Sequence, residues 1–118
     1  MADACSCGGT CKLILACSGG SDVGEITDRV ARRLARDGKG KMFCSNGIGA
    51  HIDGMIESAK AAGELIAIDG CRIACVKKAL EHIGLSARCF NLKAMGYEKG
   101  NTPCTEGVVD EVLQKMGV

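Results

Sequence analysis

The sequence has few aromatic residues, no tryptophan and a single proline. Only 3% of its 118 residues are aromatic, so the core must be built from aliphatic, methionine and cysteine side chains. Proteins that bind single-stranded nucleic acid stack bases on exposed rings, which this chain barely has. The formal net charge is only +1, so no strong field attracts DNA or a membrane surface. We therefore expect no nucleic acid and no membrane among its partners, while a small molecule or a protein stays open.

The chain also has no apolar run approaching the roughly 20 residues that a membrane-spanning helix needs. Its first residues, MADACSCGGT, lack the basic and apolar regions of a secretory signal. We therefore expect a cytoplasmic protein. In that reducing compartment, nine cysteines favour metal binding or thiol chemistry over a disulfide framework.

Four strand–helix units follow one another, and no linker divides them. Apolar runs predict strands over residues 12–17, 41–44, 64–69 and 87–92. Apolar residues at helical spacing predict a helix after each strand. The expected core positions of these helices are Val23, Ile26, Val30, Ala31 and Leu34; Ile52, Met55, Ile56 and Ala59; Ile73, Val76, Leu80 and Ile83; Val108, Val109, Val112, Leu113 and Met116. Such alternation is typical of a parallel sheet with helices on both faces.

The first and third strands are the most hydrophobic and should lie at the centre of the sheet. With right-handed crossovers, this predicts a three-layer α/β/α, Rossmann-like domain whose four-stranded, mostly parallel sheet has the order 2-1-3-4. The domain should span residues 12–118, with residues 1–11 as a cysteine-containing N-terminal appendage. Thr102 is the expected cap of the last helix, with Pro103 at its first position.

Three cysteines stand at or just past the ends of three predicted strands. Cys17, Cys44 and Cys71 are separated by equal intervals of 27 residues (44 − 17 and 71 − 44). Neighbouring strands lie about 4.8 Å apart, so these thiols should gather at the carboxyl edge of the sheet. Ligands of open α/β sheets bind at this edge, near the point where the strand order reverses.

Cys75 offers a fourth thiol. If the third helix begins at Cys71, Cys75 lies one turn later on the same face, away from the apolar stripe. A cysteine that only filled the core would lie on the stripe. Four thiolates can complete a tetrahedral zinc site with Zn–S distances of about 2.3 Å. The spacing therefore predicts a shared metal site of Cys17, Cys44, Cys71 and Cys75.

The segments CSGGSDVG, GKGKMFCSNGIGAHI and ESAKAAGELIAIDGCRIACVKKALEHIG resemble the DGC-domain family, which is described as zinc-binding. That family takes its name from the Asp-Gly-Cys motif, which here is Asp69-Gly70-Cys71. The resemblance covers residues 12–118 and is most specific in the central motif. It implies that the family's four metal-chelating cysteines are Cys17, Cys44, Cys71 and Cys75. It implies no particular reaction, so whether the protein is an enzyme stays open.

Three functions are compatible with such a site. Zinc with four thiolates is typical of a structural site, which has no position for catalytic water. The same cysteines could hold an iron–sulfur cluster, or act as reactive thiols in a redox or sulfur-handling protein. A zinc-dependent enzyme would leave one cysteine out and keep one coordination position open for water.

Other polar residues near the predicted site each have more than one possible role. Asp69 is favoured to cap the third helix or to hydrogen-bond a metal ligand, rather than to bind the metal. His51 either reaches the metal as an extra ligand or proton carrier, or is solvated at a helix start. His82 lies about 10 Å from Cys75 along the helix and should be on the surface. The loop SGGSDVG resembles an anion-binding loop, but Asp22 would repel phosphate, and a tight turn at its glycines is favoured.

The remaining cysteines are expected outside the shared site. Cys11 stands at the opposite end of the first strand from Cys17, about 20 Å away. Together with Cys5 and Cys7 it forms either a second thiol cluster or part of an oxidisable tail. Cys89 is expected in the core. Cys104 is expected to be structural, with a lowered pKa if it is exposed near the helix start.

The arginines of the first helix should form a solvated face: Arg29, Arg32, Arg33 and Arg36.

Overall fold

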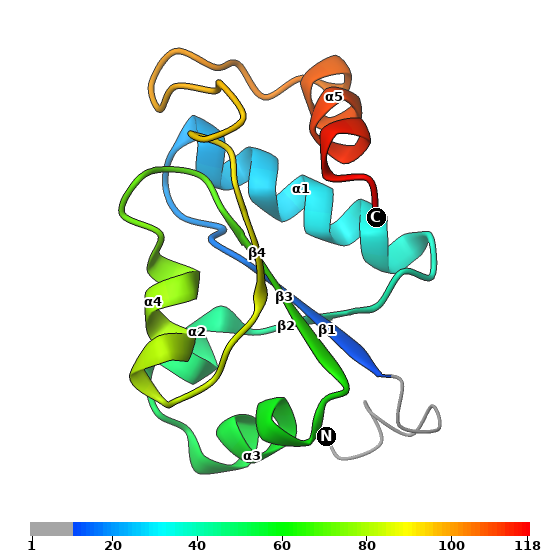
Figure 1. Cartoon of the computed structure of the whole chain (residues 1–118). Coiled ribbons are helices and arrows are strands. Elements are labelled where there is room, and N and C mark those ends of the chain that lie inside the picture. Colours follow the sequence, from blue (N-terminus) through cyan, green and yellow to red (C-terminus); the bar gives the residue numbers. More distant parts are fainter. Residues whose placement is uncertain (1–10) are drawn as a thin grey trace.

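Strands and helices alternate along the chain in a computed structural model, which describes residues 11–118 (Figure 1). The strands are β1 (Lys12–Ala16), β2 (Lys41–Phe43), β3 (Glu64–Asp69) and β4 (Arg88–Asn91). The helices are α1 (Asp22–Arg36), α2 (Ser45–Gly49), α3 (Asp53–Ala61), α4 (Cys75–His82) and α5 (Glu106–Met116). One sheet contains all these strands in the order β2-β1-β3-β4, and each pair is parallel. The predicted fold class and strand order are therefore confirmed.

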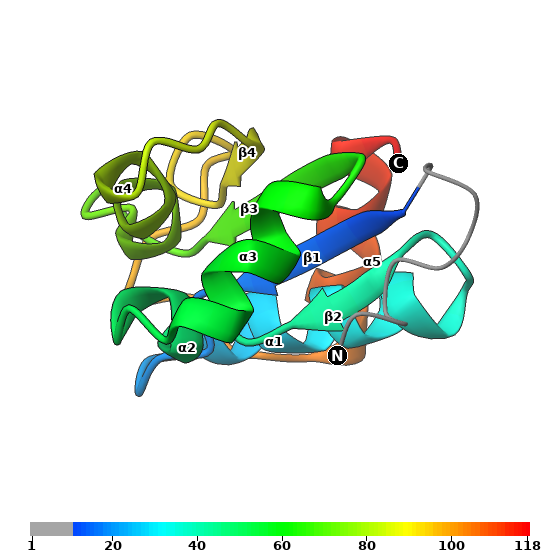
Figure 2. The same cartoon turned by 90° about the horizontal axis from the view of Figure 1, so that it is seen from below.

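The sheet separates two apolar layers. Helices lie on both of its faces, α1 and α5 on one and α2, α3 and α4 on the other (Figures 1 and 2). Successive strand residues face opposite sides, so the residues of β1 divide between the layers. Ile14 and Ala16 pack with residues of α1 and α5 on one face. Leu13 and Leu15 pack with residues of α2, α3 and α4 on the other. This division makes the three-layer α/β/α arrangement.

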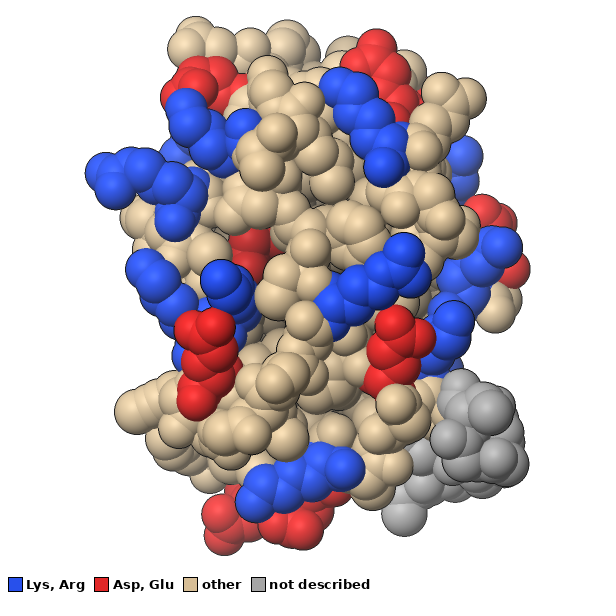
Figure 3. Space-filling view, in the orientation of Figure 1, with Lys and Arg blue, Asp and Glu red and all other residues tan. Residues whose placement is uncertain are grey.

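Helix α1 begins at a polar cap and carries ion pairs on its exposed face. The Ser21 hydroxyl accepts a hydrogen bond from Gly24 N–H at 3.0 Å, which satisfies one of the unpaired N–H groups of the first turn. Arg33 forms an ion pair with Asp110 of α5 at 2.8 Å, and Arg32 pairs with Asp28 at 2.7 Å. Basic and acidic side chains are interspersed over the face of the molecule shown in Figure 3. None of the described helices is long and apolar enough to cross a membrane.

The second predicted helix is two helices, and this corrects one core position. α2 ends at Gly49, His51 adopts a left-handed conformation with φ 58°, and α3 begins at Asp53. Ile52 therefore precedes α3 and is 50% exposed, so its predicted place in the core is wrong. Ile73 is also wrongly predicted as core. It is 47% exposed because α4 begins only at Cys75, after the turn that contains it.

The predicted cap of the last helix is also wrong. Thr105 caps α5 by accepting a hydrogen bond from Val108 N–H at 3.2 Å. Thr102 is instead buried before the helix, where its hydroxyl donates to the Glu98 carbonyl at 2.7 Å. Cys89 is exposed rather than in the core, because β4 is an edge strand and the helices leave that side chain uncovered.

Candidate functional site

The candidate cysteines follow strands that end together at the carboxyl edge. Leu15 of β1 is in register with Phe43 of β2, and Ala16 with Ile68 of β3. Cys17 and Cys44 therefore leave the sheet side by side, each one residue after its strand. The Cys17 N–H donates to the Ile68 carbonyl at 3.0 Å and continues the ladder to β3.

Cys17 and Cys44 line the same cavity, which has a volume of about 560 Å³. Asp28 and Arg32 of α1 also line it, and the Asp28 carboxylate accepts hydrogen bonds from Arg32 Nε at 2.7 Å and from Ser18 Oγ at 2.8 Å. The sequence did not indicate that these two α1 residues lie at the candidate site. The only available signal was their spacing of four on a solvated helix face, which does not distinguish them from other surface pairs.

The Asp-Gly-Cys motif is held by three separate contacts. Asp69 is 2% exposed, and its carboxylate accepts hydrogen bonds from Val76 N–H at 2.9 Å and Lys77 N–H at 3.1 Å. It therefore caps α4 from the end of β3. A Cβ atom at Gly70 would lie 2.8 Å from Val23 Cγ2, so only glycine fits there without a shift of the chain. The Cys71 carbonyl accepts from Asn91 Nδ2 at 2.9 Å.

The turn between Cys71 and α4 differs from the prediction. α4 begins at Cys75, so Cys71 and Cys75 do not share a helical turn. Ala74, just before the helix, is left-handed, with φ 55° and ψ 54°. This conformation costs a residue with a Cβ atom about 1–2 kcal/mol. Since the Asp69 carboxylate binds the N–H groups of Val76 and Lys77, it favours a helix start at this point.

The sulfur atoms of the four cysteines are not gathered at one point. Cys17 packs against the apolar layer under α2, α3 and α4, whereas Cys71 packs against the layer under α1 and α5. Cys71 also lines a different cavity, of about 230 Å³. Cys44 and Cys75 are exposed. Within residues 11–118, no group of three or more His, Cys, Asp or Glu side chains is arranged to hold a metal ion.

Cys17 nevertheless lies within electrostatic range of the other candidate groups. Burial raises the pKa of the Cys17 thiol, and a hydrogen bond from the Gly19 backbone partly opposes this rise. The negative charges of Asp69, Cys75 and Cys71 raise that pKa further. A divalent cation among these groups would relieve both the burial and the repulsion of the thiolate. Thiols are the donors that suit a thiophilic ion, and the one cation that lines the cavity of Cys17 and Cys44, Arg32, is paired with Asp28.

The neighbour of His51 in the structure is another histidine, and not the metal that was considered for it. Its ring lies against that of His82, with ring centroids 5.2 Å apart and planes at 65°. Both residues are exposed, His51 between α2 and α3 and His82 at the end of α4. No sequence pattern relates two positions this far apart along the chain.

The other cysteines lie apart from the carboxyl edge. Cys11 is buried immediately before β1, at the opposite end of that strand from Cys17, and its carbonyl accepts from Gly63 N–H at 2.8 Å. Cys5 and Cys7, the rest of the predicted second cluster, lie outside the described residues.

Cys104 is half-buried against the layer of α1 and α5. Burial raises the pKa of Cys104, so the environment of this thiol is the opposite of that of a reactive cysteine.

Comparison with known proteins places the sequence among relatives. A family model described as the DGC domain matches residues 13–116. The chain is similar to the anaerobic and virulence modulator AnvM of Pseudomonas aeruginosa, with 35% identity over 68 residues. The matched segment is 58% of this chain and 52% of AnvM, so the match spans about half the length of that relative. No solved structure matches the sequence.

Proposed function

Because the chain belongs to the DGC-domain family, we propose that it is a zinc-binding protein whose ligands are the thiolates of Cys17, Cys44, Cys71 and Cys75. The observation that carries this proposal is the position of these residues. All four follow or adjoin the carboxyl ends of β1, β2 and β3, which are neighbours in the sheet. Two of them already line one cavity.

The backbone around Cys17 supports a thiolate ligand. The Gly19 N–H donates to the Cys17 sulfur, and a Cβ atom at Gly19 would lie 3.3 Å from that sulfur. Glycine therefore allows the backbone donor to approach closely. Ser45 Oγ donates to the Ala16 carbonyl at 2.9 Å, which ties the turn of Cys44 to the strand of Cys17. These contacts orient the first two ligands in the way that partners of metal ligands usually do.

The Cys71–Ala74 turn is the part that would have to move. Cys71 packs toward the opposite layer from Cys17, and Cys75 is exposed. Zinc binding would therefore involve a rearrangement of this turn, where the left-handed Ala74 already costs backbone energy. Metal binding in small sites is commonly coupled to such local ordering. When bound, zinc with four thiolates supplies stability and leaves no open position for water.

A thiol-based redox or iron–sulfur protein is the second candidate. The observation that favours its thiol-based form is that Cys17 and Cys44 share a cavity while Cys71 faces another; an iron–sulfur cluster, like zinc, would require the four cysteines to come together. A pair of neighbouring thiols suits disulfide chemistry, although burial raises the pKa of Cys17 and makes this thiol less nucleophilic than an ordinary one. AnvM is named an anaerobic and virulence modulator, and this name is compatible with a redox-sensitive role for the present chain.

Anaerobic purification followed by metal analysis and a visible spectrum tests both candidates. We expect one zinc ion per chain and no visible absorption. Iron with inorganic sulfide and a brown colour would instead establish the cluster. Cobalt substitution then counts thiolates: a four-sulfur spectrum supports the closed zinc site, and a spectrum with an oxygen ligand supports an enzyme with bound water.

Matched cysteine variants locate the metal. Cys75→Ser should lose zinc and lower the thermal stability of the purified protein. Cys89→Ser is the control, because Cys89 is also exposed but lies on β4, away from the three strand ends. Stoichiometric zinc in Cys75→Ser would remove this residue from the ligand set.

A further inference from the structure

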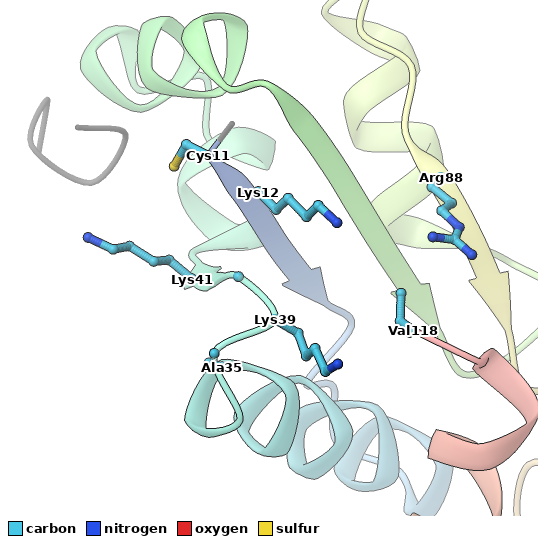
Figure 4. A pocket seen from close by; sticks show the side chains of 9 residues that line it. Cys11, Lys12, Ala35, Lys39, Lys41, Arg88 and Val118 are labelled. Carbon is cyan, nitrogen blue, oxygen red and sulfur yellow. The ribbon is translucent and has the colours of Figure 1, made fainter. Parts of the chain in front are cut away.

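A cavity of about 730 Å³ lies at the amino edge of the sheet, opposite the edge of Cys17 and Cys44 (Figure 4). It is bounded by the start of β1, the start of β4, the last turn of α1, the connection from α1 to β2, and Val118. Four of its nine lining residues are Lys or Arg, and none is Asp or Glu. The volume is within the range of about 300–1,000 Å³ that is usual for small-molecule sites.

Three of the four cations extend into the same region. In Figure 4 the charged ends of Lys12, Lys39 and Arg88 extend toward the space around Val118, whereas Lys41 extends away from it. The register of the sheet explains why Lys12 and Arg88 extend from the same face. Ile66 of β3 pairs with Arg88 on one side and with Ile14 on the other, and Lys12 is two residues before Ile14. Lys12 and Arg88 therefore stand on the same face of the sheet.

Among the described side chains, only Glu64 pairs with one of these cations, and the last residue, Val118, adds its terminal carboxylate to the lining of the cavity. Within the described part of the chain, Lys12 forms one ion pair, with Glu64 at 3.5 Å, and both side chains are partly exposed. No carboxylate of residues 11–118 forms an ion pair with Lys39 or Arg88. The guanidinium of Arg88 lies over the Phe90 ring, 5.2 Å from its centroid, which keeps it on this face.

The connection between α1 and β2 is held in place before any ligand binds. The Lys39 N–H donates to the Leu34 carbonyl at 2.9 Å, and the Asp37 N–H donates to the Arg33 carbonyl at 2.9 Å. These bonds pair two of the last carbonyl groups of α1 and fix the connection against the end of the helix. A Cβ atom at Gly40 would lie 2.9 Å from the Lys12 carbonyl, so the connection packs directly on β1.

We propose that this amino-edge cavity binds a small organic anion that carries two phosphate or carboxylate groups. The cations belong to two walls, Lys12 and Arg88 on the sheet and Lys39 on the connection, so a ligand with two anionic groups can engage both. The planar guanidinium of Arg88 suits bidentate contact with one phosphate, and the two lysines act as point charges. The site lies at the opposite edge of the sheet from Cys17 and Cys44 and does not depend on the proposed metal.

Titration of the full chain with fructose 1,6-bisphosphate, in reducing buffer of low ionic strength, tests this proposal. Calorimetry and the amide NMR shifts of residues 38–41 and 88 are the readouts. We expect saturable binding with a Kd of about 1 mM or tighter, weaker binding at higher salt, and no response to neutral fructose. The double variant Lys39→Gln/Arg88→Gln should bind about 10-fold or more weakly, since it loses two charged contacts.

Lys41→Gln is the matched control, because it removes an equal charge from a lysine whose ammonium group points away from the cavity. We expect its affinity to equal that of the wild type. The proposal is overturned if the wild type shows no saturable response, if the double variant binds as well as the wild type, or if Lys41→Gln weakens binding as much as Lys39→Gln. Each single variant provides the comparison if the double variant fails to fold.

Discussion

Gly70 of the Asp-Gly-Cys motif lies against Val23 at the start of α1. A Cβ atom at Gly70 would come within 2.8 Å of Val23 Cγ2 and 3.0 Å of the Val23 backbone carbon. The contact joins the end of β3 to the first turn of α1, so the glycine of the motif has a packing role that is separate from any metal.

Gly70→Ala should therefore destabilise the protein. Because the neighbouring atoms include backbone, relief requires a shift of α1 or β3, and overpacking of this kind costs about 1–3 kcal/mol. Urea unfolding measures the change in the free energy of unfolding. Gly54→Ala is the control, since a Cβ atom there meets open space within α3. It should be neutral or stabilise by up to about 1 kcal/mol. Equal effects of the two variants would contradict the close contact.

Asp69→Asn should weaken the start of α4. The carboxylate accepts from two backbone N–H groups with its two oxygens, and an amide can present only one oxygen while its NH₂ group faces the other donor. Leaving a buried N–H without a partner costs about 1–3 kcal/mol. Hydrogen exchange at the Val76 and Lys77 amides and urea unfolding are the measurements. Asp53→Asn, in the exposed first turn of α3, should change stability far less.

Ala74→Gly should relieve the left-handed backbone before α4. Removal of the Cβ atom recovers about 1 kcal/mol of conformational strain, offset by the greater entropy of glycine in the unfolded chain. The net effect should be neutral or slightly stabilising. Ala79→Gly, inside α4, has no strain to relieve and should destabilise by about 1 kcal/mol. A loss of stability in Ala74→Gly as large as in Ala79→Gly would show that the turn does not have this conformation.

Asp22 should make the stability of the protein depend on acidic pH. Its carboxylate accepts hydrogen bonds from Gly100 N–H at 2.9 Å and Thr102 N–H at 3.0 Å, and these bonds lower its pKa in the folded protein. The carboxylate therefore stabilises the fold above its ordinary pKa of about 3.9. That contribution is lost as the pH falls through the lower pKa of the folded state.

Melting temperatures of the wild type and Asp22→Asn, measured from neutral to acidic pH, test this dependence. The wild type should melt higher at neutral pH, and the difference should shrink as the carboxylate is protonated. A difference that stays constant with pH would mean that the hydrogen bonds, rather than the charge, account for the effect of the substitution. Asp53→Asn again serves as the control, because its carboxylate makes no hydrogen bond or ion pair among the described residues.

The local sequence determined the architecture and the order of the strands. β1 and β3 are continuous apolar segments that must be covered on both faces, so they lie at the centre, and β2 and β4 lie at the edges. Right-handed crossovers then leave the order 2-1-3-4. The same reasoning placed Cys17 and Cys44 at one edge, because the ends of parallel strands in register coincide. Hydrophobic period is a local property and could be read directly from the chain.

Only the tertiary structure decided where α4 begins and which way the thiols turn. Asp69 reaches forward to the N–H groups of Val76 and Lys77, so the helix starts at Cys75, and Cys71 turns toward a different layer from Cys17. The contact of His51 with His82 likewise joins α4 to the segment between α2 and α3. Apolar spacing reports which residues need burial. The direction of a loop side chain depends on hydrogen bonds and packing between segments that are distant in the sequence, and these exist only in the folded chain.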